Sequence, residues 1–321
     1  MTLAEQLAAD GVDQWFVDAV DRLARNDEID LSAYLESVGL ERTIDGTKTT
    51  CRCHFVARDG NGRPAVKKLA KVLVNLAVDY AIPRSRIAEA IAAHGRSGST
   101  AALVQLSNEA RSLFAAVDRS GEGGEMLIFL LLEQLLGIPQ IFAKISLKTN
   151  TQMHIHGTDG VHAKALPNGG LALYWCESKL YANVREGIDS CFDSIAPFLL
   201  DDGDGDSQTD LLLVRDHVDT ADPELTEHLI RYFKEGDPLS LKREVRGASL
   251  IGFSLSEYPV PFEDDGVTVS AAINAYLGDW FQRVGTRVVD HSLDSFEMEV
   301  FLLPVPSVEE FRKAFRQGLG I

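Results

Sequence analysis

The sequence lacks the features that mark secreted, disulfide-bonded and membrane proteins. Its 321 residues contain only four cysteines, and Cys51 and Cys53 stand too close together to close a useful disulfide loop, which favours reduced thiols. The longest apolar stretch, residues 126–136, is interrupted by Glu133 and Gln134 and is too short to span a bilayer. No basic segment followed by a long apolar run opens the chain, so we expect no signal peptide. We therefore predict a cytoplasmic protein that is not associated with a membrane.

Several motifs of other enzyme classes are absent as well. The sequence has no Gly-x-x-x-x-Gly-Lys phosphate loop and no Gly-x-Ser-x-Gly turn around a nucleophilic serine. The glycines within residues 121–124 are not preceded by the strand that a dinucleotide-binding turn requires. The chain therefore carries no nucleotide-driven motor of its own, and any nucleotide hydrolysis must come from a partner.

Positive charge is scarce. The chain has 31 Lys and Arg residues against 48 Asp and Glu residues, a net charge of −17, which argues against a protein that coats nucleic acid. The bases gather in two clusters that are compatible with a DNA-facing surface, although ordinary solvated helix faces explain the first cluster equally well. The first comprises Arg52, Arg58, Arg63, Lys67, Lys68, Lys71, Arg84 and Arg86, and the second Lys144, Lys148, Lys164, Lys179 and Arg185. The acids are concentrated between positions 201 and 222.

What the sequence does contain is an alternation of helical and strand patterns. Residues 1–119 read as a mainly helical region, with helices over 3–25, 66–80, 85–94 and 99–117 and one strand over 50–56. Residues 120–321 read as a second domain. Its predicted elements are helices 125–136, 184–199, 225–233, 269–283 and 307–317 and strands 141–147, 156–166, 171–177, 249–256 and 295–303. This order predicts an α/β fold in which a mixed central sheet is flanked by helices.

Asp159, Glu177 and Lys179 form the candidate catalytic group. Asp159 stands near the start of a predicted strand, and the next predicted strand, which follows a Gly-Gly turn, ends in Glu177-Ser178-Lys179. Residues i and i+2 of a strand point to the same face, so Glu177 and Lys179 emerge together, and a hairpin would bring Asp159 alongside them. A Glu-x-Lys at a strand end is common on passive surfaces. However, the nearly apolar run 171–176 indicates a buried central strand, where such a pair is less expected.

These side chains suit phosphodiester hydrolysis. The substrate is already anionic, so the reaction needs an activated water and neutralisation of added charge. Mg²⁺ or Mn²⁺ does both and prefers one or two carboxylates plus water and phosphate oxygens, so we expect Asp159 and Glu177 to hold the ion. Lys179 would orient or help deprotonate the water and stabilise the developing charge. Glu125, at the start of the preceding helix, is a candidate for a further carboxylate near the metal.

Three histidines suggest a zinc site as an alternative. His154, His156 and His162 have even spacings that place them on one face of a strand, but no fourth ligand follows at a convincing spacing. We therefore favour a role for His156 or His162 in lining the catalytic cleft or in packing.

Two further segments carry weak metal-binding signals. Cys51-x-Cys53-His54 is better explained by strand residues of a reduced protein, and Cys176 by a place in the core. The acidic residues 201–206 resemble a calcium loop but lack its terminal glutamate, so a flexible solvated loop is the better interpretation.

The order of helix, strand, Asp-bearing strand, Glu-x-Lys strand and helix resembles the PD-(D/E)xK nuclease superfamily. More narrowly, three segments resemble the HamA family of Hachiman anti-phage defence systems, and the resemblance is firmest over residues 120–197. The segments are Gly121-Glu122-Gly123-Gly124-Glu125, His156-Gly157-Thr158-Asp159-Gly160 and Trp175-Cys176-Glu177-Ser178-Lys179. Thr158 replaces the proline of the superfamily label, which weakens the motif match but removes no metal ligand.

The resemblance implies a restriction-endonuclease-like core over residues 120–321 that hydrolyses DNA with Mg²⁺ or Mn²⁺. It implies metal binding by Asp159 and Glu177, a catalytic role for Lys179 and an accessory role for Glu125. It also implies a superfamily 2 helicase partner, HamB, that restrains the nuclease until foreign or damaged DNA is sensed.

The rival hypothesis is a catalytically silent subunit that keeps the nuclease fold and binds a helicase or DNA. The intact set of Asp159, Glu177 and Lys179 favours the enzyme, because a silent subunit has no need of all three. The net charge favours dependence on a partner or on a local basic surface, because a chain of −17 repels free DNA.

Overall fold

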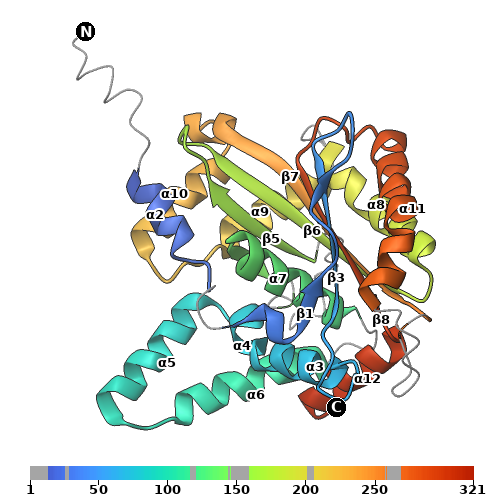
Figure 1. The fold of residues 1–321 in the computed structure, drawn as a ribbon. Helices are drawn as coiled ribbons and strands as arrows, with labels where there is room; N and C mark the ends of the chain where they lie inside the picture. Colours follow the sequence, from blue (N-terminus) through green and yellow to red (C-terminus); the bar gives the residue numbers. More distant parts are fainter. Residues whose placement is uncertain are drawn as a thin grey trace.

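One eight-stranded mixed sheet forms the centre of the molecule, with the strand order β1-β3-β8-β7-β6-β5-β4 and β2 paired to β3 (Figure 1). The computed structural model describes residues 14–25, 29–115, 121–143, 145, 159–200, 206–256, 258 and 269–321. The strands are β1 (Leu35–Ser37), β2 (Arg42–Thr43), β3 (Thr49–Val56), β4 (Gln140–Ala143), β5 (Gly160–Ala165), β6 (Leu171–Tyr181), β7 (Arg243–Ser254) and β8 (Met298–Val305). The predicted α/β fold with a mixed central sheet is thereby confirmed.

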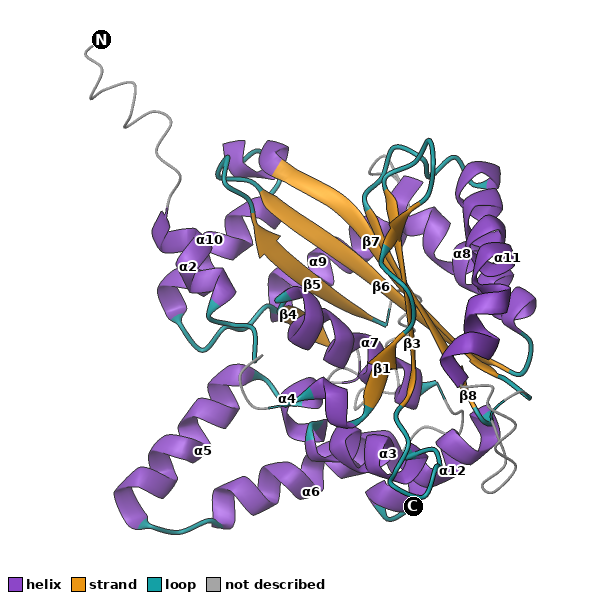
Figure 2. Cartoon of the chain, in the orientation of Figure 1, coloured by secondary structure: helices purple, strands orange, loops and turns teal. Residues whose placement is uncertain are grey.

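The helices cover both faces of this sheet (Figure 2). They are α2 (Gln14–Asp21), α3 (Val66–Asn75), α4 (Ala77–Ala81), α5 (Arg84–Ser97), α6 (Ala101–Ala115), α7 (Glu122–Leu136), α8 (Val184–Leu200), α9 (Asp206–His217), α10 (Pro223–Phe233), α11 (Val269–Asp290) and α12 (Val308–Leu319). Short 3₁₀ turns lie at Leu31–Ala33 and Pro238–Lys242. No helix within the described ranges is long and apolar enough to cross a membrane.

The middle of the sheet is parallel and its two ends are antiparallel. β3, β8, β7 and β6 run in the same direction, whereas β5 and β4 on one side and β1 and β2 on the other are antiparallel to their neighbours. The β6–β7 ladder is the longest, from Leu171↔Arg243 to Tyr181↔Phe253. Parallel strands covered on both faces are apolar on both faces, which explains the continuous hydrophobic run at the start of β6.

Alternate residues of β6 enter two separate cores. Leu173 and Trp175 point into the core that α2, α8, α9, α10 and α11 cover, while Tyr174 and Cys176 point into the core that α3 to α7 and α12 cover. By the same period of two, Glu177 and Lys179 lie on the α8 face and Ser178 lies on the α7 face. The pleat of this one strand therefore decides which helix each motif residue meets.

The N-terminal region belongs to the same sheet. β3 pairs in parallel with β8, from Thr49↔Met298 to Cys53↔Leu302, although about 250 residues separate the two strands. The sheet therefore contains strands from both sides of the predicted domain boundary between residues 119 and 120.

Several predicted elements have different limits in the structure. The helix predicted over 66–80 is two helices, because the chain turns at Leu76, where neither Gly nor Pro signals a break. β6 runs to Tyr181 instead of ending at residue 177, so the Glu-x-Lys motif lies inside a strand. β1, β2 and α9 were not expected from the sequence. Residues 3–13, and parts of the strands predicted over 141–147 and 156–166, lie outside the described residues.

Candidate active site

Asp159 and Glu177 lie close together at the open end of the β5–β6 hairpin. The ladder ends with Gly160 opposite Cys176, and the Asp159 N–H donates a hydrogen bond of 2.9 Å to the Cys176 carbonyl oxygen. Asp159 is thereby held against the Cys176–Ser178 segment of β6, where its charge acts on the Glu177 carboxylate. The hairpin that the sequence predicted is therefore present, and it brings Asp159 beside Glu177.

Ser178, the middle residue of the motif, holds Asp159 in place. Its backbone N–H and its Oγ–H both donate to Asp159 Oδ2, at 2.8 and 2.7 Å. Sequence reasoning passed over this residue, although a small hydroxyl side chain between Glu177 and Lys179 is a usable signal. The two bonds leave Oδ1 as the carboxylate oxygen that Ser178 does not engage.

Glu177 is a buried acid, with 4% of the residue exposed. Its Oε1 lies 2.5 Å from the Lys179 Nζ, and Ser194 on α8 also hydrogen-bonds the carboxylate. The pKa of Glu177 is raised to about 7, because burial and, to a smaller extent, the charge of Asp159 raise it more than Lys179 and Ser194 lower it. The carboxylate is therefore costly to ionise beside Asp159 unless a further positive charge is present.

Lys179 stays cationic in this arrangement. Burial lowers the pKa of its ammonium, but the charges of Glu177 and Asp159 and the hydrogen bond with Glu177 outweigh burial and raise the pKa above its ordinary value. A quarter of the side chain remains exposed, so the ammonium is reachable from solvent. Lys179 can therefore donate hydrogen bonds to an anionic substrate while Glu177 orients it.

Glu125 is linked to the same end of the sheet through Tyr80. Glu125 lies in the first turn of α7, and its Oε2 accepts a hydrogen bond of 2.8 Å from the buried Tyr80 hydroxyl on α4. The same hydroxyl lies 3.5 Å from the Asp159 carbonyl oxygen. Burial raises the pKa of Tyr80, as do the charges of Glu125 and Asp159, so its hydroxyl keeps its proton and acts as a donor. Tyr80 was not anticipated, because nothing in its local sequence indicates a partner 45 residues away.

The two central glycines of the Gly-Glu-Gly-Gly-Glu segment let α7 approach its neighbours closely. A Cβ at Gly124 would lie 3.0 Å from Ser178 Oγ, and a Cβ at Gly123 would lie 2.9 Å from the Phe311 ring. Gly124 has no side chain and therefore leaves room for the Ser178 side chain, which orients Asp159 through a hydrogen bond. The segment that resembles the HamA family thus has a packing function in this fold.

The donor set fits a divalent cation of the magnesium type. Two carboxylates, one of them buried with a raised pKa, repel each other across the hairpin, and a cation between them removes that penalty. Within the described ranges, no three His, Cys, Asp or Glu side chains gather closely enough to ligate one ion, so Asp159 and Glu177 are the carboxylates that the structure offers. Such a pair leaves coordination positions for water and phosphate oxygens, which suits Mg²⁺ better than a closed zinc site.

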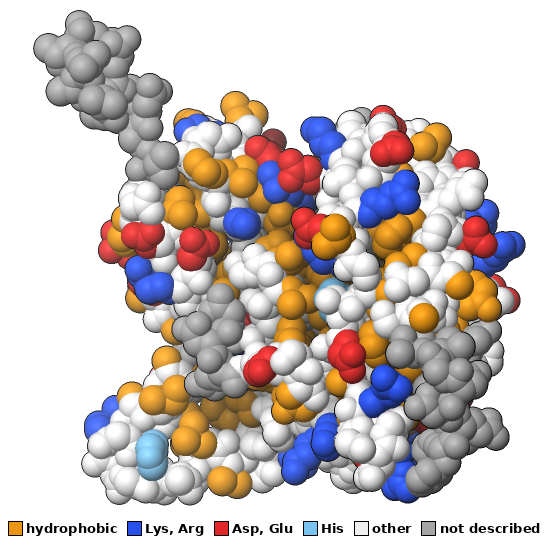
Figure 3. All heavy atoms as spheres, viewed as in Figure 1, with side chains coloured by type: hydrophobic (Ala, Val, Ile, Leu, Met, Phe, Trp, Pro, Cys, Tyr) orange, Lys and Arg blue, Asp and Glu red, His pale blue; other side chains and the backbone are white. Residues whose placement is uncertain are grey.

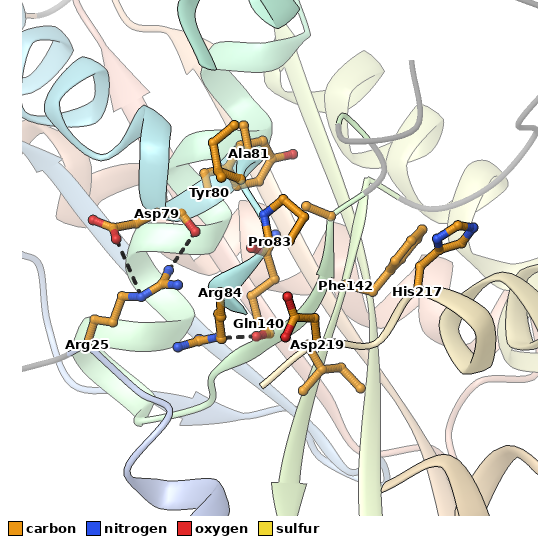
Figure 4. A pocket seen from close by; sticks show the side chains of 13 residues that line it. Arg25, Asp79, Tyr80, Ala81, Pro83, Arg84, Gln140, Phe142, His217 and Asp219 are labelled. Atoms are coloured by element: carbon orange, nitrogen blue, oxygen red, sulfur yellow. Dashed lines mark hydrogen bonds and ion pairs between the residues drawn. The ribbon is translucent and has the colours of Figure 1, made fainter. Parts of the chain in front are cut away.

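A polar pocket of about 40 Å³ lies beside the candidate site (Figure 4). Arg25 bonds to Asp79, and Arg84 donates to the Gln140 carbonyl oxygen at 3.3 Å and pairs with the buried Glu133 at 3.5 Å. Burial lowers the pKa of Arg84 to about 10, with Arg25 acting in the same direction. The volume suits a water molecule and no larger ligand. We therefore assign these charged groups a structural role, in which their hydrogen bonds and ion pairs link the neighbouring helices to β4.

The remaining candidate ligands have structural roles where the structure describes them. His162 is fully buried, its Nδ1 lies 2.7 Å from the Ile138 carbonyl oxygen, and burial lowers its pKa to about 4. Cys51 and Cys53 are buried free thiols in β3, and burial raises the pKa of Cys51 to about 12. The predicted zinc ligands His154 and His156 lie outside the described residues.

The first basic cluster divides into two groups. Arg52 pairs with Glu41 and Glu299, and Arg86 with Glu109, so these bases serve internal ion pairs. By contrast, Arg63, Lys67 and Lys68 of this cluster line a groove of about 660 Å³ between α3 and α12. Lys313 from α12 and the acids Asp59 and Glu310 complete the charged lining of this groove. Figure 3 shows Lys and Arg side chains over the lower part of the molecule, where Figure 1 places these two helices.

The mixed sheet, the helices on both its faces and the acidic pair at the β5–β6 hairpin define an α/β protein with a restriction-endonuclease-like core. The sequence profile of the HamA family matches residues 32–319, nearly the whole chain. The chain therefore belongs to the HamA family, which makes it a Hachiman-associated protein. Searches of curated proteins and of solved structures found no match.

Proposed function

We propose that this protein is a metal-dependent deoxyribonuclease of the PD-(D/E)xK type that acts in anti-phage defence together with a superfamily 2 helicase of the HamB kind. The observation that carries the proposal is the arrangement at the open end of the β5–β6 hairpin, where the charge of Asp159 acts on Glu177 and Lys179 pairs with Glu177 at 2.5 Å. Two neighbouring carboxylates, one of them buried with a raised pKa, are costly in a fold, whereas a metal-dependent phosphodiesterase requires them.

Each side chain has a defined task in this proposal. Asp159 and Glu177 hold Mg²⁺ or Mn²⁺, which supplies charge neutralisation for the phosphate and lowers the pKa of water. Ser178 fixes the orientation of Asp159 through two hydrogen bonds. Ser194 on α8 hydrogen-bonds the Glu177 carboxylate and orients it. The Lys179 ammonium donates to a phosphate oxygen and stabilises charge that develops on it. Glu125 and Tyr80 support the backbone at Asp159 from the α7 face.

The helicase partner accounts for two properties of the chain. The sequence contains no phosphate loop, so it cannot move along DNA by nucleotide hydrolysis. Its net charge of −17 repels free DNA, so a partner that holds DNA would bring the substrate to the site. Membership of the HamA family supports this arrangement.

The test is cleavage of supercoiled plasmid with Mg²⁺ or Mn²⁺, with and without the helicase encoded beside the gene. Wild type should nick or degrade the plasmid, and Glu177→Ala and Lys179→Ala should each lower the rate at least about 100-fold. Glu186→Ala and Lys242→Ala are matched controls, because both residues are exposed; Glu186 lies in the first turn of α8, and Lys242 precedes β7 at the far end of the β6–β7 ladder. Both controls should cleave as wild type does.

Three outcomes are informative. Loss of cleavage in both site variants with intact controls supports the nuclease. Cleavage that survives both substitutions shows that other residues carry the chemistry. No cleavage by wild type under any of these conditions favours the silent-subunit hypothesis instead.

A further inference from the structure

A second hollow, of about 340 Å³, opens beyond the C-terminal end of β7, where α8 begins and α11 passes over the sheet. Phe253, Leu255 and Trp280 form its apolar wall, and Tyr276 extends the wall to the surface. The charged residues of the lining are Arg185 and Arg283, which form its basic rim, and one acid, Asp279. Figure 1 shows α8 and α11 side by side over this part of the sheet. A hollow of this size with aromatic walls and a few charged groups has the character of a small-ligand site.

The hollow lies next to the candidate active site and on the same face of the sheet. Lys179 pairs with Ile251 and Tyr181 pairs with Phe253 in the parallel β6–β7 ladder, and Ile251 and Phe253 both point into the α8 face. Two residues along a strand and one strand across correspond to about 8 Å between the Cα atoms of Lys179 and Phe253.

The aromatic wall is an ordered stack that ends at the surface. The Phe253 and Trp280 rings meet edge to face, with centroids 4.8 Å apart and an interplanar angle of 77°. Tyr276 stacks on Trp280 with centroids 5.8 Å apart and planes inclined by 19°. Trp280 is 7% exposed and Tyr276 is 38% exposed, so the stack runs from the core to solvent. Aromatic faces of this kind bind planar bases with little sequence preference.

The rim adds positive charge to this stack. The Arg283 guanidinium is held by Asp189, with its Nε 2.9 Å from Oδ1, so it stands in a fixed orientation over α8. Arg185 is exposed in the first turn of α8 and has no ion pair with any described residue. Guanidinium groups bind phosphates and stack on bases, so aromatic rings and arginines together match a nucleotide.

We propose that this hollow binds one unstacked base of the DNA strand whose phosphodiester lies at Asp159, Glu177 and Lys179. The inference rests on the proposed nuclease function and narrows its substrate to single-stranded or locally unpaired DNA, because a base inside a duplex cannot enter a pocket. An apolar side chain of a partner protein is the other conceivable occupant. The adjacent lysine and the arginine rim favour the nucleotide, because a purely apolar anchor needs no positive charge around it.

The experiment measures binding without cleavage. Fluorescence anisotropy with the full chain in EDTA compares a labelled octathymidylate with an abasic octamer of the same length and charge. Wild type should bind the thymidylate about 10-fold more tightly than the abasic strand, because one or more bases stack in the hollow. Tyr276→Ala should reduce the affinity for thymidylate to that for the abasic strand and leave the abasic affinity unchanged. Tyr276→Phe, which keeps the ring, should bind as wild type does.

Val289→Ala is the matched control, because Val289 is an exposed apolar residue on α11 outside the hollow. Equal effects of Tyr276→Ala on both strands, or no effect on either, would overturn the proposal. If Tyr276→Ala weakened binding of the helicase and left binding of both DNA strands unchanged, a partner protein would occupy the hollow, and the base-pocket proposal would be overturned as well.

The cleavage and binding experiments distinguish failure of the nuclease proposal from failure of the base-pocket proposal. Base-dependent binding that needs Tyr276, in a chain that cleaves no DNA under any condition, would retain the base pocket and reject the nuclease. Cleavage that depends on Glu177 and Lys179, with binding indifferent to Tyr276, would retain the nuclease and reject the pocket.

Discussion

Ser178 donates two hydrogen bonds to a single carboxylate oxygen of Asp159, one from its backbone N–H at 2.8 Å and one from its Oγ at 2.7 Å. Ser178, which stands between Glu177 and Lys179, therefore orients Asp159, the third charged residue of the site. Hydrogen bonds to a charged acceptor are roughly twice as strong as neutral ones, so this contact keeps Asp159 in one rotamer.

Ser178→Ala should weaken metal binding while the fold stays intact. The substitution removes the Oγ donor and keeps the backbone donor, so Asp159 is held by one bond instead of two. Removing a group that orients a metal ligand typically weakens binding 10- to 100-fold, and we expect about 10-fold for Mn²⁺ by isothermal titration calorimetry. Ser112→Ala, on the surface of α6, is the control and should not change the affinity. An unchanged affinity in Ser178→Ala would mean that Asp159 needs no such support.

Gly124→Ala should slow cleavage by roughly 10-fold, because a Cβ at this position approaches Ser178 Oγ to 3.0 Å and Leu180 Cγ to 3.3 Å. The Ser178 side chain must shift by a few tenths of an ångström, which disturbs the hydrogen bond from its Oγ to Asp159. Plasmid cleavage and thermal unfolding should be measured together. Gly95→Ala on α5 is the matched control, because a Cβ there meets nothing within 4 Å. It should stabilise its helix by about 0.5–1 kcal/mol and leave cleavage unchanged. Full activity in Gly124→Ala would show that Ser178 tolerates the shift.

Tyr80→Phe should lower the free energy of unfolding by about 1–2 kcal/mol, because Glu125 Oε2 loses a buried hydrogen-bond donor. Urea unfolding followed by circular dichroism measures this change. Tyr34→Phe provides the comparison, since Tyr34 is only partly buried and its hydroxyl has no hydrogen bond to a described residue. In the Glu125→Gln background the loss should shrink. If Tyr80→Phe lowered the free energy of unfolding equally in the wild-type and Glu125→Gln backgrounds, the Tyr80 hydroxyl would stabilise the fold through a group other than Glu125.

His162 should make the protein acid-sensitive. Burial lowers its pKa to about 4 in the folded state, against about 6.5 when unfolded. Between these values the unfolded chain binds a proton that the folded chain does not bind, so stability is complete above pH 6.5 and is lost as pH falls towards 4. The loss assigned to His162 is on the order of 3 kcal/mol.

The check is urea unfolding of wild type and His162→Gln between pH 7 and pH 4. Glutamine can donate to the Ile138 carbonyl oxygen but does not titrate, so the variant should lose less stability over this range. His54, whose pKa burial also lowers to about 4, stays in both proteins and cancels in the comparison. Parallel pH profiles for the two proteins would contradict the assignment.

The local part of the site was predictable from the sequence, and the non-local part was not. The Gly-Gly turn and the alternation of side chains along β6 were enough to place Asp159 beside Glu177 and Lys179, because hairpin geometry is set by nearby residues. The link from Glu125 to Tyr80 depends on how α4 packs against α7, which no pattern within either helix encodes. The roles of these residues in catalysis stay predictions until cleavage is measured.

The same distinction holds for the fold. The α/β class followed from the order of elements, but the place of β3 beside β8 did not, because a single isolated strand at residues 49–56 carries no indication of its partner. The break between α3 and α4 at Leu76 could not be predicted either, because no Gly or Pro stands there to signal it.

The pairing of β3 with β8 also has a consequence for synthesis on the ribosome. The sheet cannot close until residues 298–305 have left the exit tunnel, because β3 and β7 both use β8 as their parallel partner. A truncated product that stops before β8 leaves β3 and β7 with unpaired strand edges, which favours aggregation and degradation over a partly assembled protein. Completion of the sheet in this way depends on translation through β8, which stands between β3 and β7 in the strand order.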